Sequence, residues 1–340
     1  MSYKIKKDAV CGMIGYGSWA TALVYTLHTN RQNVWWHIRN PEVLESIQTE
    51  GRNAKYLSDI DFDREYINAT DDINEVVRNS DIIIIAAPSA YLKDFLKDLT
   101  EPLDDKFILS ATKGIIPDDY KTITEFFRDT YNLSYDHLGL ISGPSHAEEV
   151  GMDRLSYLTV ACKDEENARK IGDMFKSSTF RVSHSTDIYG IEYAAILKNI
   201  YALAGGLAYG LGYGDNTKAA LMTRGIAEIK RLGVKMGASA ETFAGLSGIG
   251  DLIVTCTSMH SRNRRCGILL GKGEKLADAQ KEVGMVVEGV YTAKAAYELA
   301  KKNGVEMPIV NEAYKILFED KNARDAVNEL MTRDKTVENK

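Results

Sequence analysis

Lys198 is a candidate for proton transfer because of its neighbours in the sequence. It lies in the stretch Glu192–Ile200, and the positions three to five residues away are mostly small or apolar. At helical spacing such neighbours would separate the amine from water, which lowers the pKa of a lysine and makes it a usable general acid or base. The alternative is a lysine at the edge of a core helix, with its amine extended to solvent.

Two further charged residues could work with Lys198. Lys113 stands beside Gly114 at the end of an expected strand, in the segment Ser-Ala-Thr-Lys-Gly. Asp251 stands between glycine-rich sequence and an apolar run, so its carboxylate either caps a helix or pairs with a cation. Contact with Lys198 would orient and tune the amine. We take Lys198, Lys113 and Asp251 as the candidate catalytic residues.

A basic cluster follows Asp251 in the sequence, and its five residues are Ser261, Arg262, Asn263, Arg264 and Arg265. This composition is typical of a helix start that offers hydrogen-bond donors to an anion, and arginine is well shaped to bind a phosphate with two hydrogen bonds. The alternative for Arg264 and Arg265 is a solvated basic face. A second loop that could join the site is Ser142-Gly-Pro-Ser-His-Ala147.

The N-terminal segment carries the pattern of a dinucleotide-binding turn. Gly15-x-Gly17-x-x-Ala20 follows a short apolar run and opens a helical pattern. Gly15 allows the tight turn, and Gly17 has no Cβ, so that the backbone can approach a pyrophosphate. The first helical N–H groups, near Ser18 and Trp19, would face the anion. The pattern predicts binding of NAD or NADP.

The end of the second expected strand bears on the choice of cofactor. An acidic residue about 20 residues beyond the glycines usually binds the ribose 2′-hydroxyl of NAD. This chain instead reads Trp-Trp-His-Ile-Arg39-Asn40, without an acid. A cation there suits a 2′-phosphate, which favours NADP or the use of both cofactors. The alternative is that Arg39 is only a solvated strand-end residue.

The surrounding elements predict an α/β Rossmann-type doubly wound sheet followed by an all-α C-terminal domain. The expected strands are Ala9–Ile14, Val34–Ile38, Asp81–Ala87, Phe107–Ala111, Leu138–Ser142, Tyr157–Ala161 and Phe180–Ser183. The expected helices of the second half are Ile188–Gly206, Lys218–Met236, Glu241–Ala244, Asn263–Leu270, Thr292–Lys302, Ile309–Glu319 and one from Ala323. We place the domains at residues 1–187 and 188–340, and expect a frayed charged tail over residues 332–340.

Composition limits the function classes further. The chain has 340 residues, 44% of them hydrophobic and 26% charged, which is ordinary for a globular protein of two domains. Its net charge of −6 argues against a nucleic-acid partner. The four cysteines form no C-x-x-C pair, so we expect reduced thiols, no metal site and a cytoplasmic location. No apolar stretch approaches the about 18 residues that a membrane span needs.

Several segments, in this order and spacing, resemble the bacterial type of NAD(P)-dependent glycerol-3-phosphate dehydrogenase, from Gly12 to about Ala326. The matching segments are Gly15–Ala22, Ala111–Gly114, Ser142–Ser145, Leu197–Asn199, Gly248–Leu252, Thr255–Thr257, Ser261–Arg265, Val286–Gly289 and Met307–Pro308. The resemblance implies interconversion of dihydroxyacetone phosphate and sn-glycerol 3-phosphate with NAD or NADP, in support of phospholipid synthesis. It also implies a homodimer.

The resemblance implies roles for individual residues as well. Lys198 matches the catalytic lysine at the substrate oxygen, and Lys113 matches a lysine that contacts cofactor and substrate. The substrate shell that it implies comprises Lys113, Gly143, Ser145, Lys198, Asp251, Ser261, Arg262 and Asn263. The cofactor shell comprises Gly15, Gly17, Ser18, Trp19, His37, Arg39, Lys113, Ala147, Arg262, Val286 and Glu288.

The chain also departs from the family pattern. His146 stands where the family usually has phenylalanine, and Glu148-Glu149 replaces Lys-Glu. The strand end at residues 36–41 carries an extra residue, so that His37 could share the 2′-contact with Arg39. Two rival functions stay open on the sequence: a 6-phosphogluconate or β-hydroxyacid type of dehydrogenase, and a nucleotide-sensing protein without turnover. The basic cluster and the turn at Lys113 favour the glycerol phosphate family.

Overall fold

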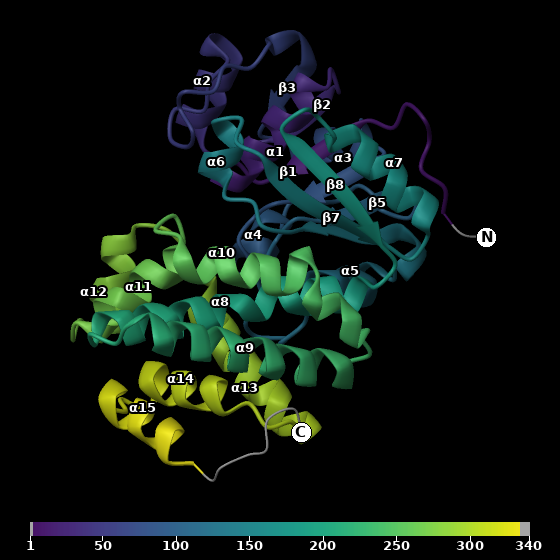
Figure 1. Cartoon of the computed structure of the whole chain (residues 1–340). Helices are drawn as coiled ribbons and strands as arrows, with labels where there is room; N and C mark the ends of the chain where they lie inside the picture. The colour runs from purple at the N-terminus through teal and green to yellow at the C-terminus, as the bar shows by residue number, and fades with distance from the viewer. Residues whose placement is uncertain (1–2, 334–340) are drawn as a thin grey trace.

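The computed structural model describes residues 3–333, which form a sheet-containing half and a helical half. Figure 1 shows the sheet with its helices above and the bundle of longer helices below. The described residues contain an eight-stranded sheet in the order β3-β2-β1-β4-β5-β6-β7-β8. The strands are β1 Cys11–Ile14, β2 Val34–His37, β3 Ile67–Thr70, β4 Ile82–Ile85, β5 Phe107–Ser110, β6 Leu138–Ser142, β7 Ser156–Cys162 and β8 Phe180–Ser185.

Six neighbouring strands, from β3 to β6, run parallel, and β7 is antiparallel to β6. The four isoleucines of β4 explain why the sheet is buried on both faces. Ile82 and Ile84 belong to one hydrophobic cluster, and Ile83 and Ile85 belong to another. Side chains alternate between the faces of a strand, so an unbroken apolar run suits a strand that helices cover on both sides. The predicted Rossmann-type fold is confirmed.

The helices of the sheet half are shorter than those that follow it. They are α1 Ser18–Thr29, α2 Pro41–Glu50, α3 Ile73–Arg78, α4 Leu92–Phe95, α5 Ile123–Tyr131, α6 Ala147–Gly151 and α7 Glu165–Phe175. The sheet ends with β8 at Ser185, and α8 begins at Ile188, close to the predicted change from strands to helices. The helical half contains α8 Ile188–Gly210, α9 Asp215–Lys235, α10 Asp251–Thr257, α11 Arg262–Gly271, α12 Leu276–Val283, α13 Glu288–Asn303, α14 Pro308–Phe318 and α15 Ala323–Thr332.

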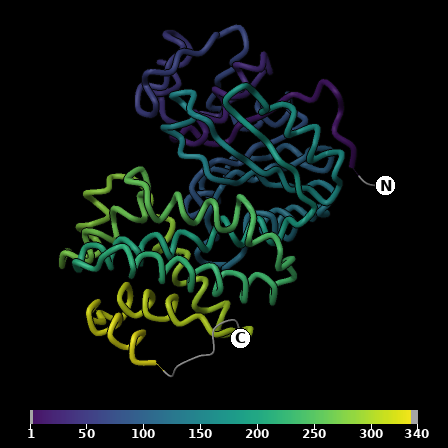
Figure 2. Tube along the Cα trace, viewed as in Figure 1, coloured from purple at the N-terminus to yellow at the C-terminus, as the bar shows by residue number. Residues whose placement is uncertain are grey.

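Helix α8 is the central element of the helical half, and nearly all of its side chains are buried. It packs unusually closely against α11, because two glycines remove the side chains between them. A Cβ on Gly206 would overlap the carbonyl of Arg264, and one on Gly267 would overlap the carbonyl of Leu203. This close packing fixes the N-terminus of α11 relative to the middle of α8. Figure 2 shows that α14 and α15 form the layer farthest from the sheet.

Some expectations about single elements were wrong or incomplete. Strand β3 was missed because only Ile67 of its four residues is buried, as befits a short edge strand. Residues 240–244 form a 3₁₀ turn rather than an α-helix, and α10 and α12 were not predicted. The expected tail at residues 332–340 lies outside the described residues from position 334 on. Among the residues that the structure describes, no helix has the length and apolar character needed to cross a bilayer.

Candidate active site

The glycine turn after β1 has the geometry that the fingerprint predicts. Gly15 has a φ of +119°, and a Cβ there would meet the backbone of Ala86, the residue after β4. Gly17 caps α1 without a side-chain hydrogen bond, and a Cβ there would meet nothing within 4 Å. The N–H groups at the start of α1, from Ser18 and Trp19, are thus left for a ligand.

Two buried residues that the sequence reasoning missed hold this turn in place. The indole Nε1 of Trp36 donates to the Gly15 carbonyl at 2.7 Å. Asn53, which is fully buried, donates to the Tyr16 carbonyl at 3.0 Å and to the Thr21 hydroxyl at 2.9 Å. The buried hydrogen bonds of this amide hold the glycine turn in one conformation, although glycine backbone is otherwise flexible. Neither residue belongs to the glycine motif, because Trp36 lies on β2 and Asn53 follows α2. The motif therefore could not reveal them.

Arg39 and His37, at the end of β2, differ in their exposure to solvent. The Arg39 guanidinium lies 4.0 Å from the centroid of the Phe95 ring and pairs with Asp94 at 2.7 Å. It is therefore held in place rather than simply solvated. His37 is buried, and burial lowers the pKa of its imidazole to about 4, so that it is neutral. The structure leaves Arg39 as the more accessible of the two for a 2′-phosphate, and the contact itself stays a prediction.

The centre of the site is a buried amine on α8 beside a buried carboxylate on α10. The Lys198 side chain is 5% exposed, and its Nζ lies 2.5 Å from Asp251 Oδ1. It also donates to the Thr255 hydroxyl at 2.8 Å. Asp251 and Thr255 are one helical turn apart on α10, so that both face α8. The alternative of a lysine extended to solvent is wrong.

Lys113 completes this cluster from the sheet half. Its Nζ donates to Asp251 Oδ2 at 3.1 Å and to the Gly143 carbonyl at 3.1 Å, and it lies 5.5 Å from the centre of the Trp19 ring. One carboxylate thus holds two ammonium groups, one from each half of the chain. The structure brings together all three candidate catalytic residues at the carboxyl ends of the parallel strands, where ligands bind in such sheets.

The charged groups of this cluster shift one another's pKa values. Burial lowers the pKa of Lys198 to about 7, because the attraction of Asp251 only partly offsets the loss of water and the repulsion of Lys113. Burial alone would raise the pKa of Asp251, but the two ammonium groups overcome this and hold it below its usual range. Lys198 can therefore change protonation near neutral pH, as a general acid or base must.

The loop after β6 lies against this cluster. Gly143 has a φ of +147°, and a Cβ there would meet the carbonyl oxygen of Tyr157. Its carbonyl accepts from Lys113 and from the Ser145 hydroxyl, the latter at 3.1 Å. Ala147 is buried at the start of α6. The loop is thus fixed to Lys113 of the sheet half.

The basic cluster forms the start of α11, as predicted. Ser261 caps the helix by accepting from the Arg264 N–H, and Arg262 is its first residue. Arg264 is buried, with its guanidinium 5.2 Å from the centre of the Tyr209 ring, so that a solvated face is wrong for this residue. Arg262 is half-buried, and a helix N-terminus favours an anion through its unpaired N–H groups.

Two asparagines join α8, α11 and α13 to the Lys113 loop. Asn199, which the sequence reasoning did not select, donates to the Lys113 carbonyl at 2.7 Å and accepts from Asn263 at 2.9 Å. Asn263 in turn accepts from the Gly289 N–H at 2.8 Å. The Asn263 side chain is therefore engaged within the protein, which leaves its backbone N–H as the group that faces an anion. The position of Asn199 directly after Lys198 was the available signal.

Val286 and Glu288 lie at the start of α13, and Glu288 contacts the sheet half. Glu288 accepts from the Ser89 N–H at 2.9 Å and from the Ser89 hydroxyl at 2.5 Å. Burial raises the pKa of Glu288, against the effect of these hydrogen bonds and of the nearby Arg262. The charge of Arg262 thus acts on a carboxylate that binds the loop after β4. Val286 is half-buried, and no polar contact defines its role.

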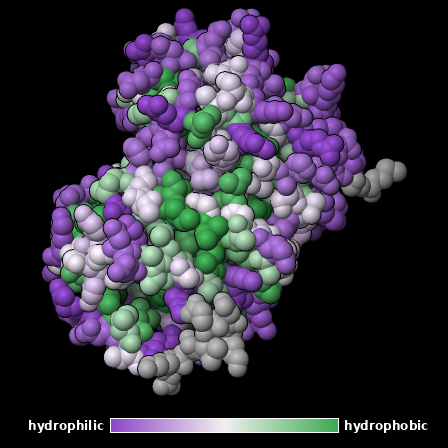
Figure 3. Space-filling view, in the orientation of Figure 1, coloured by the Kyte–Doolittle hydropathy of each residue, from purple (hydrophilic) through white to green (hydrophobic). Residues whose placement is uncertain are grey.

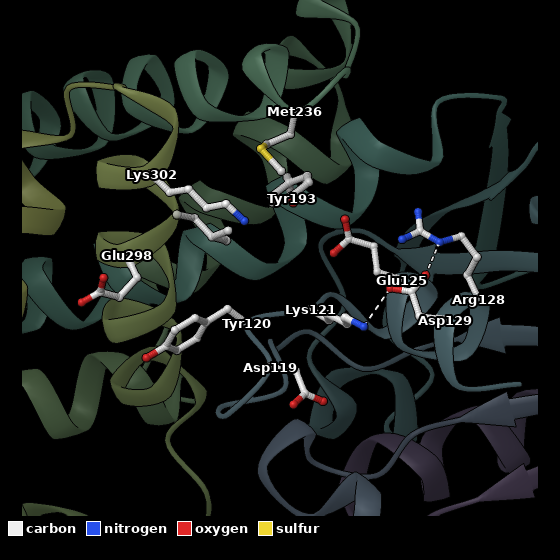
Figure 4. Close-up of a pocket in the computed structure, with 11 residues that line it drawn as sticks. Asp119, Tyr120, Lys121, Glu125, Arg128, Asp129, Tyr193, Met236, Glu298 and Lys302 are labelled. Carbon is white, nitrogen blue, oxygen red and sulfur yellow. Dashed lines mark hydrogen bonds and ion pairs between the residues drawn. The ribbon is translucent and has the colours of Figure 1, made fainter. Parts of the chain in front are cut away.

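An open hollow elsewhere between the two halves does not suit a phosphate ester. It has a volume of about 400 Å³ and shares no residue with the Lys198 cluster. Figure 4 shows its charged lining, in which Lys121 and Arg128 both pair with Asp129. The carboxylates Asp119, Glu125, Asp129 and Glu298 outnumber the cations Lys121, Arg128 and Lys302. A dianionic substrate is better served by the start of α11.

Comparisons with known proteins agree with this geometry. Residues 10–168 match the family model described as the N-terminus of NAD-dependent glycerol-3-phosphate dehydrogenase, and residues 187–328 match its C-terminus. A glycerol-3-phosphate dehydrogenase [NAD(P)+] of Oceanobacillus iheyensis is 46% identical over 327 residues, which covers 96% of this chain and 94% of that protein. One of Fusobacterium nucleatum is 46% identical over 328 residues, which covers 96% and 97%.

The structural comparison leads to the same family. The crystal structure of glycerol-3-phosphate dehydrogenase from Coxiella burnetii superposes with a TM-score of 0.89 at 32% sequence identity, covering 96% of this chain and all of that one. Both halves of the chain are matched, and the predicted family is confirmed. The chain belongs to the NAD-dependent glycerol-3-phosphate dehydrogenase family.

Proposed function

We propose that this chain interconverts dihydroxyacetone phosphate and sn-glycerol 3-phosphate with NAD or NADP, and so supplies glycerol 3-phosphate for phospholipid synthesis. The observation that carries the proposal is the Lys198–Asp251–Lys113 cluster, which joins a buried amine of the helical half to the rim of the dinucleotide-binding sheet. The family membership and the names of the relatives support the same reaction.

The residues around the glycine turn suit the cofactor. Gly15 and Gly17 leave room for a pyrophosphate, and the first N–H groups of α1, at Ser18 and Trp19, would bind it. We assign the 2′-phosphate contact of NADP to Arg39 and, less directly, to His37. The cofactor supplies the hydride. Lys113, Ala147, Arg262, Val286 and Glu288 line the path toward the reacting carbon in this assignment.

The proton step belongs to the cluster. When the ketone is reduced, negative charge develops on its C2 oxygen, and protonated Lys198 donates a proton to that oxygen. Lys113 stabilises the same charge electrostatically, and Asp251 keeps both amines oriented. In the reverse direction neutral Lys198 accepts the proton of the C2 hydroxyl. A pKa of about 7 allows the lysine to serve in both directions near neutral pH.

The phosphate of the substrate binds, in this proposal, at the start of α11. Arg262 would contact it through its guanidinium and Asn263 through its backbone N–H, with Ser261 fixing the helix start and Gly143 and Ser145 closing the pocket. Replacing Arg262 with alanine should mainly raise the KM for dihydroxyacetone phosphate. An unchanged KM would place the phosphate elsewhere.

Steady-state turnover of dihydroxyacetone phosphate, with NADH and NADPH assayed side by side, tests the proposed reaction and the cofactor preference. We expect turnover with both, and a lower KM for NADPH if Arg39 binds the 2′-phosphate. A strong preference for NADH would overturn the assignment of Arg39. Turnover of 6-phosphogluconate or a β-hydroxyacid in place of the triose ester would favour the rival dehydrogenase class.

We also propose that the chain forms a homodimer and acts in the cytoplasm, on the strength of the family resemblance. Hydrophobic side chains gather over the region of α8 to α10 on the face shown in Figure 3. Ile253 on α10 and Ile249 just before it are exposed. Apolar surface of this kind is what an oligomer would cover. Light scattering on the purified protein should give twice the mass of the chain, and the mass of a single chain would contradict the dimer.

A further inference from the structure

His146 carries a buried nitrogen that nothing in the described part of the chain satisfies. It lies in the loop after β6 and precedes α6 without capping it through its side chain. Its Nε2 atom is buried and has no hydrogen-bond partner among residues 3–333. Buried polar atoms are nearly always paired in folded proteins, so such an atom calls for a partner. The catalytic assignments above do not use His146.

The loop that carries His146 belongs to the catalytic cluster. Gly143, three residues earlier, is bound by Lys113 through its carbonyl. Lys198, Lys113, Asp251 and Glu148 all act electrostatically on the imidazole. The fifth neighbour is the ring of His260, whose centre lies 5.7 Å from that of His146. The unpaired nitrogen therefore belongs to a loop that Lys113 binds through the Gly143 carbonyl, and the charges of the cluster act on its ring.

The imidazole is neutral in this environment. Burial lowers the pKa of His146, and the ammonium groups of Lys198 and Lys113 lower it further, with Asp251 and Glu148 opposing them more weakly. A neutral imidazole offers one donor and one acceptor, and it can bind a hydroxyl group in either sense. A third positive charge beside the two lysines is thereby avoided.

The substrate presents one polar group for which no partner has been assigned. Dihydroxyacetone phosphate has a phosphate, a C2 oxygen and a C1 hydroxyl. The phosphate is assigned to Arg262 and the start of α11, and the C2 oxygen to Lys198 and Lys113. The C1 hydroxyl is adjacent to C2 and must lie near the same lysines. A buried nitrogen in the loop that Lys113 binds, and a substrate hydroxyl expected near the same lysine, thus both lack a partner.

We propose that His146 Nε2 forms a hydrogen bond with the C1 hydroxyl of the substrate and makes the enzyme selective for a hydroxymethyl ketone. The proposal rests on the proposed function, since it takes the positions of the C2 oxygen and the phosphate from it. A ketone without the hydroxyl would leave Nε2 buried and unpaired, and sites built around a substrate hydroxyl reject such analogues strongly.

The test compares dihydroxyacetone phosphate with hydroxyacetone phosphate, which has a methyl group in place of the hydroxymethyl group. The measured quantity is the ratio of the two kcat/KM values. Wild-type enzyme should favour dihydroxyacetone phosphate, and His146→Phe should reduce the ratio by about 10–100-fold, as expected for one buried hydrogen bond. His146→Gln, which keeps a hydrogen-bonding group, should retain most of the preference.

His260→Phe is the matched control, because this exposed histidine is the aromatic neighbour of His146 and has no assigned role. It should leave the ratio unchanged. A structural role of His146 would alter turnover of both ketones alike and leave the ratio constant, which would overturn the proposal. If wild-type enzyme reduces both ketones equally well, the proposal also fails, whether or not the variants fold. Wild-type enzyme that does not reduce dihydroxyacetone phosphate at all would overturn the proposed function as well.

Discussion

Two buried carboxylates of the helical half, Asp251 and Glu228, lie in opposite electrostatic environments. They are 1% and 2% exposed. Asp251 contacts two ammonium groups, which hold its pKa below the usual range. Within residues 3–333, Glu228 accepts hydrogen bonds from neutral groups, namely the Tyr201 hydroxyl at 3.1 Å and the backbone N–H of Ile309 at 2.9 Å and of Val310 at 3.4 Å. The charge of Arg231 lowers its pKa less than these hydrogen bonds do. Burial raises the pKa of Glu228 to about 7 despite these hydrogen bonds.

The comparison shows that burial alone does not identify a catalytic acid. Glu228 occupies the N-terminus of α14 and satisfies donors that the helix leaves unpaired, which is a structural task. Asp251 binds two ammonium groups, one from each half of the chain. One of them, Lys198, has a pKa of about 7 and is therefore half-protonated near neutral pH. The start of α1, by contrast with that of α14, is left open for a ligand. Charged partners from both halves of the chain distinguish the site from the core.

The largest effect should follow from removing the amine that Asp251 orients. Lys198→Ala should lower kcat by about 10²–10⁴-fold, because the C2 oxygen loses its general acid. Steady-state rates at saturating substrate measure this. Lys301→Ala, an exposed lysine on α13, is the control and should keep its rate. A Lys198→Ala enzyme with near-normal kcat would remove the amine from the mechanism.

Neutralising the two carboxylates in turn tests the contrast directly. Asp251→Asn leaves Lys198 and Lys113 to repel each other, so the pKa of Lys198 should fall further. At a pH above the pKa of Lys198, each unit by which that pKa falls lowers the protonated fraction of Lys198 tenfold. The kcat for ketone reduction at pH 8 should therefore drop by about 10–100-fold. The loss should shrink at lower pH. Glu228→Gln should change kcat little, and equal losses in both variants would break the distinction.

The pH dependence of turnover should show the titration of Lys198. Ketone reduction needs the protonated amine, so its kcat should decrease above pH about 7. Oxidation of glycerol 3-phosphate needs the neutral amine, so its kcat should increase through the same range. Rates in both directions from pH 5.5 to 9 measure this. Profiles that move together in the two directions would contradict a single lysine acting as both acid and base.

The smallest effect concerns stability and belongs to Glu228. Its folded pKa is raised above its unfolded value, so its contribution is fully present below pH about 4.5 and is lost as the pH rises through about 7. The free energy of unfolding of wild type, relative to Glu228→Gln, should therefore fall by about 3 kcal/mol over that range. Urea unfolding at several pH values measures the difference. A difference that is constant with pH would show that folding does not shift the pKa of Glu228.

The sequence predicted the helices and strands that have a periodic apolar pattern, and the residues of the motifs. It did not predict residues that act through partners distant in the sequence. The glycine turn, β4 and α8 follow from local composition and spacing, and all three are confirmed. Strand β3 was missed because an edge strand with one buried residue has no clear alternation. Asn53 and Trp36 were missed because they stabilise the glycine turn from elsewhere in the fold.

The sequence by itself determined the dinucleotide turn, most of the strands and longer helices, and the candidates Lys198, Lys113 and Asp251. These depend on periodicity and turn chemistry, which extend over a few neighbouring residues. Only the tertiary structure decided that Lys113 contacts Asp251 across 138 residues of sequence, and that Lys113 also binds the loop that carries His146. The physical reason is that desolvation and charge pairing arise where the two halves pack together, and no local pattern records which groups meet there.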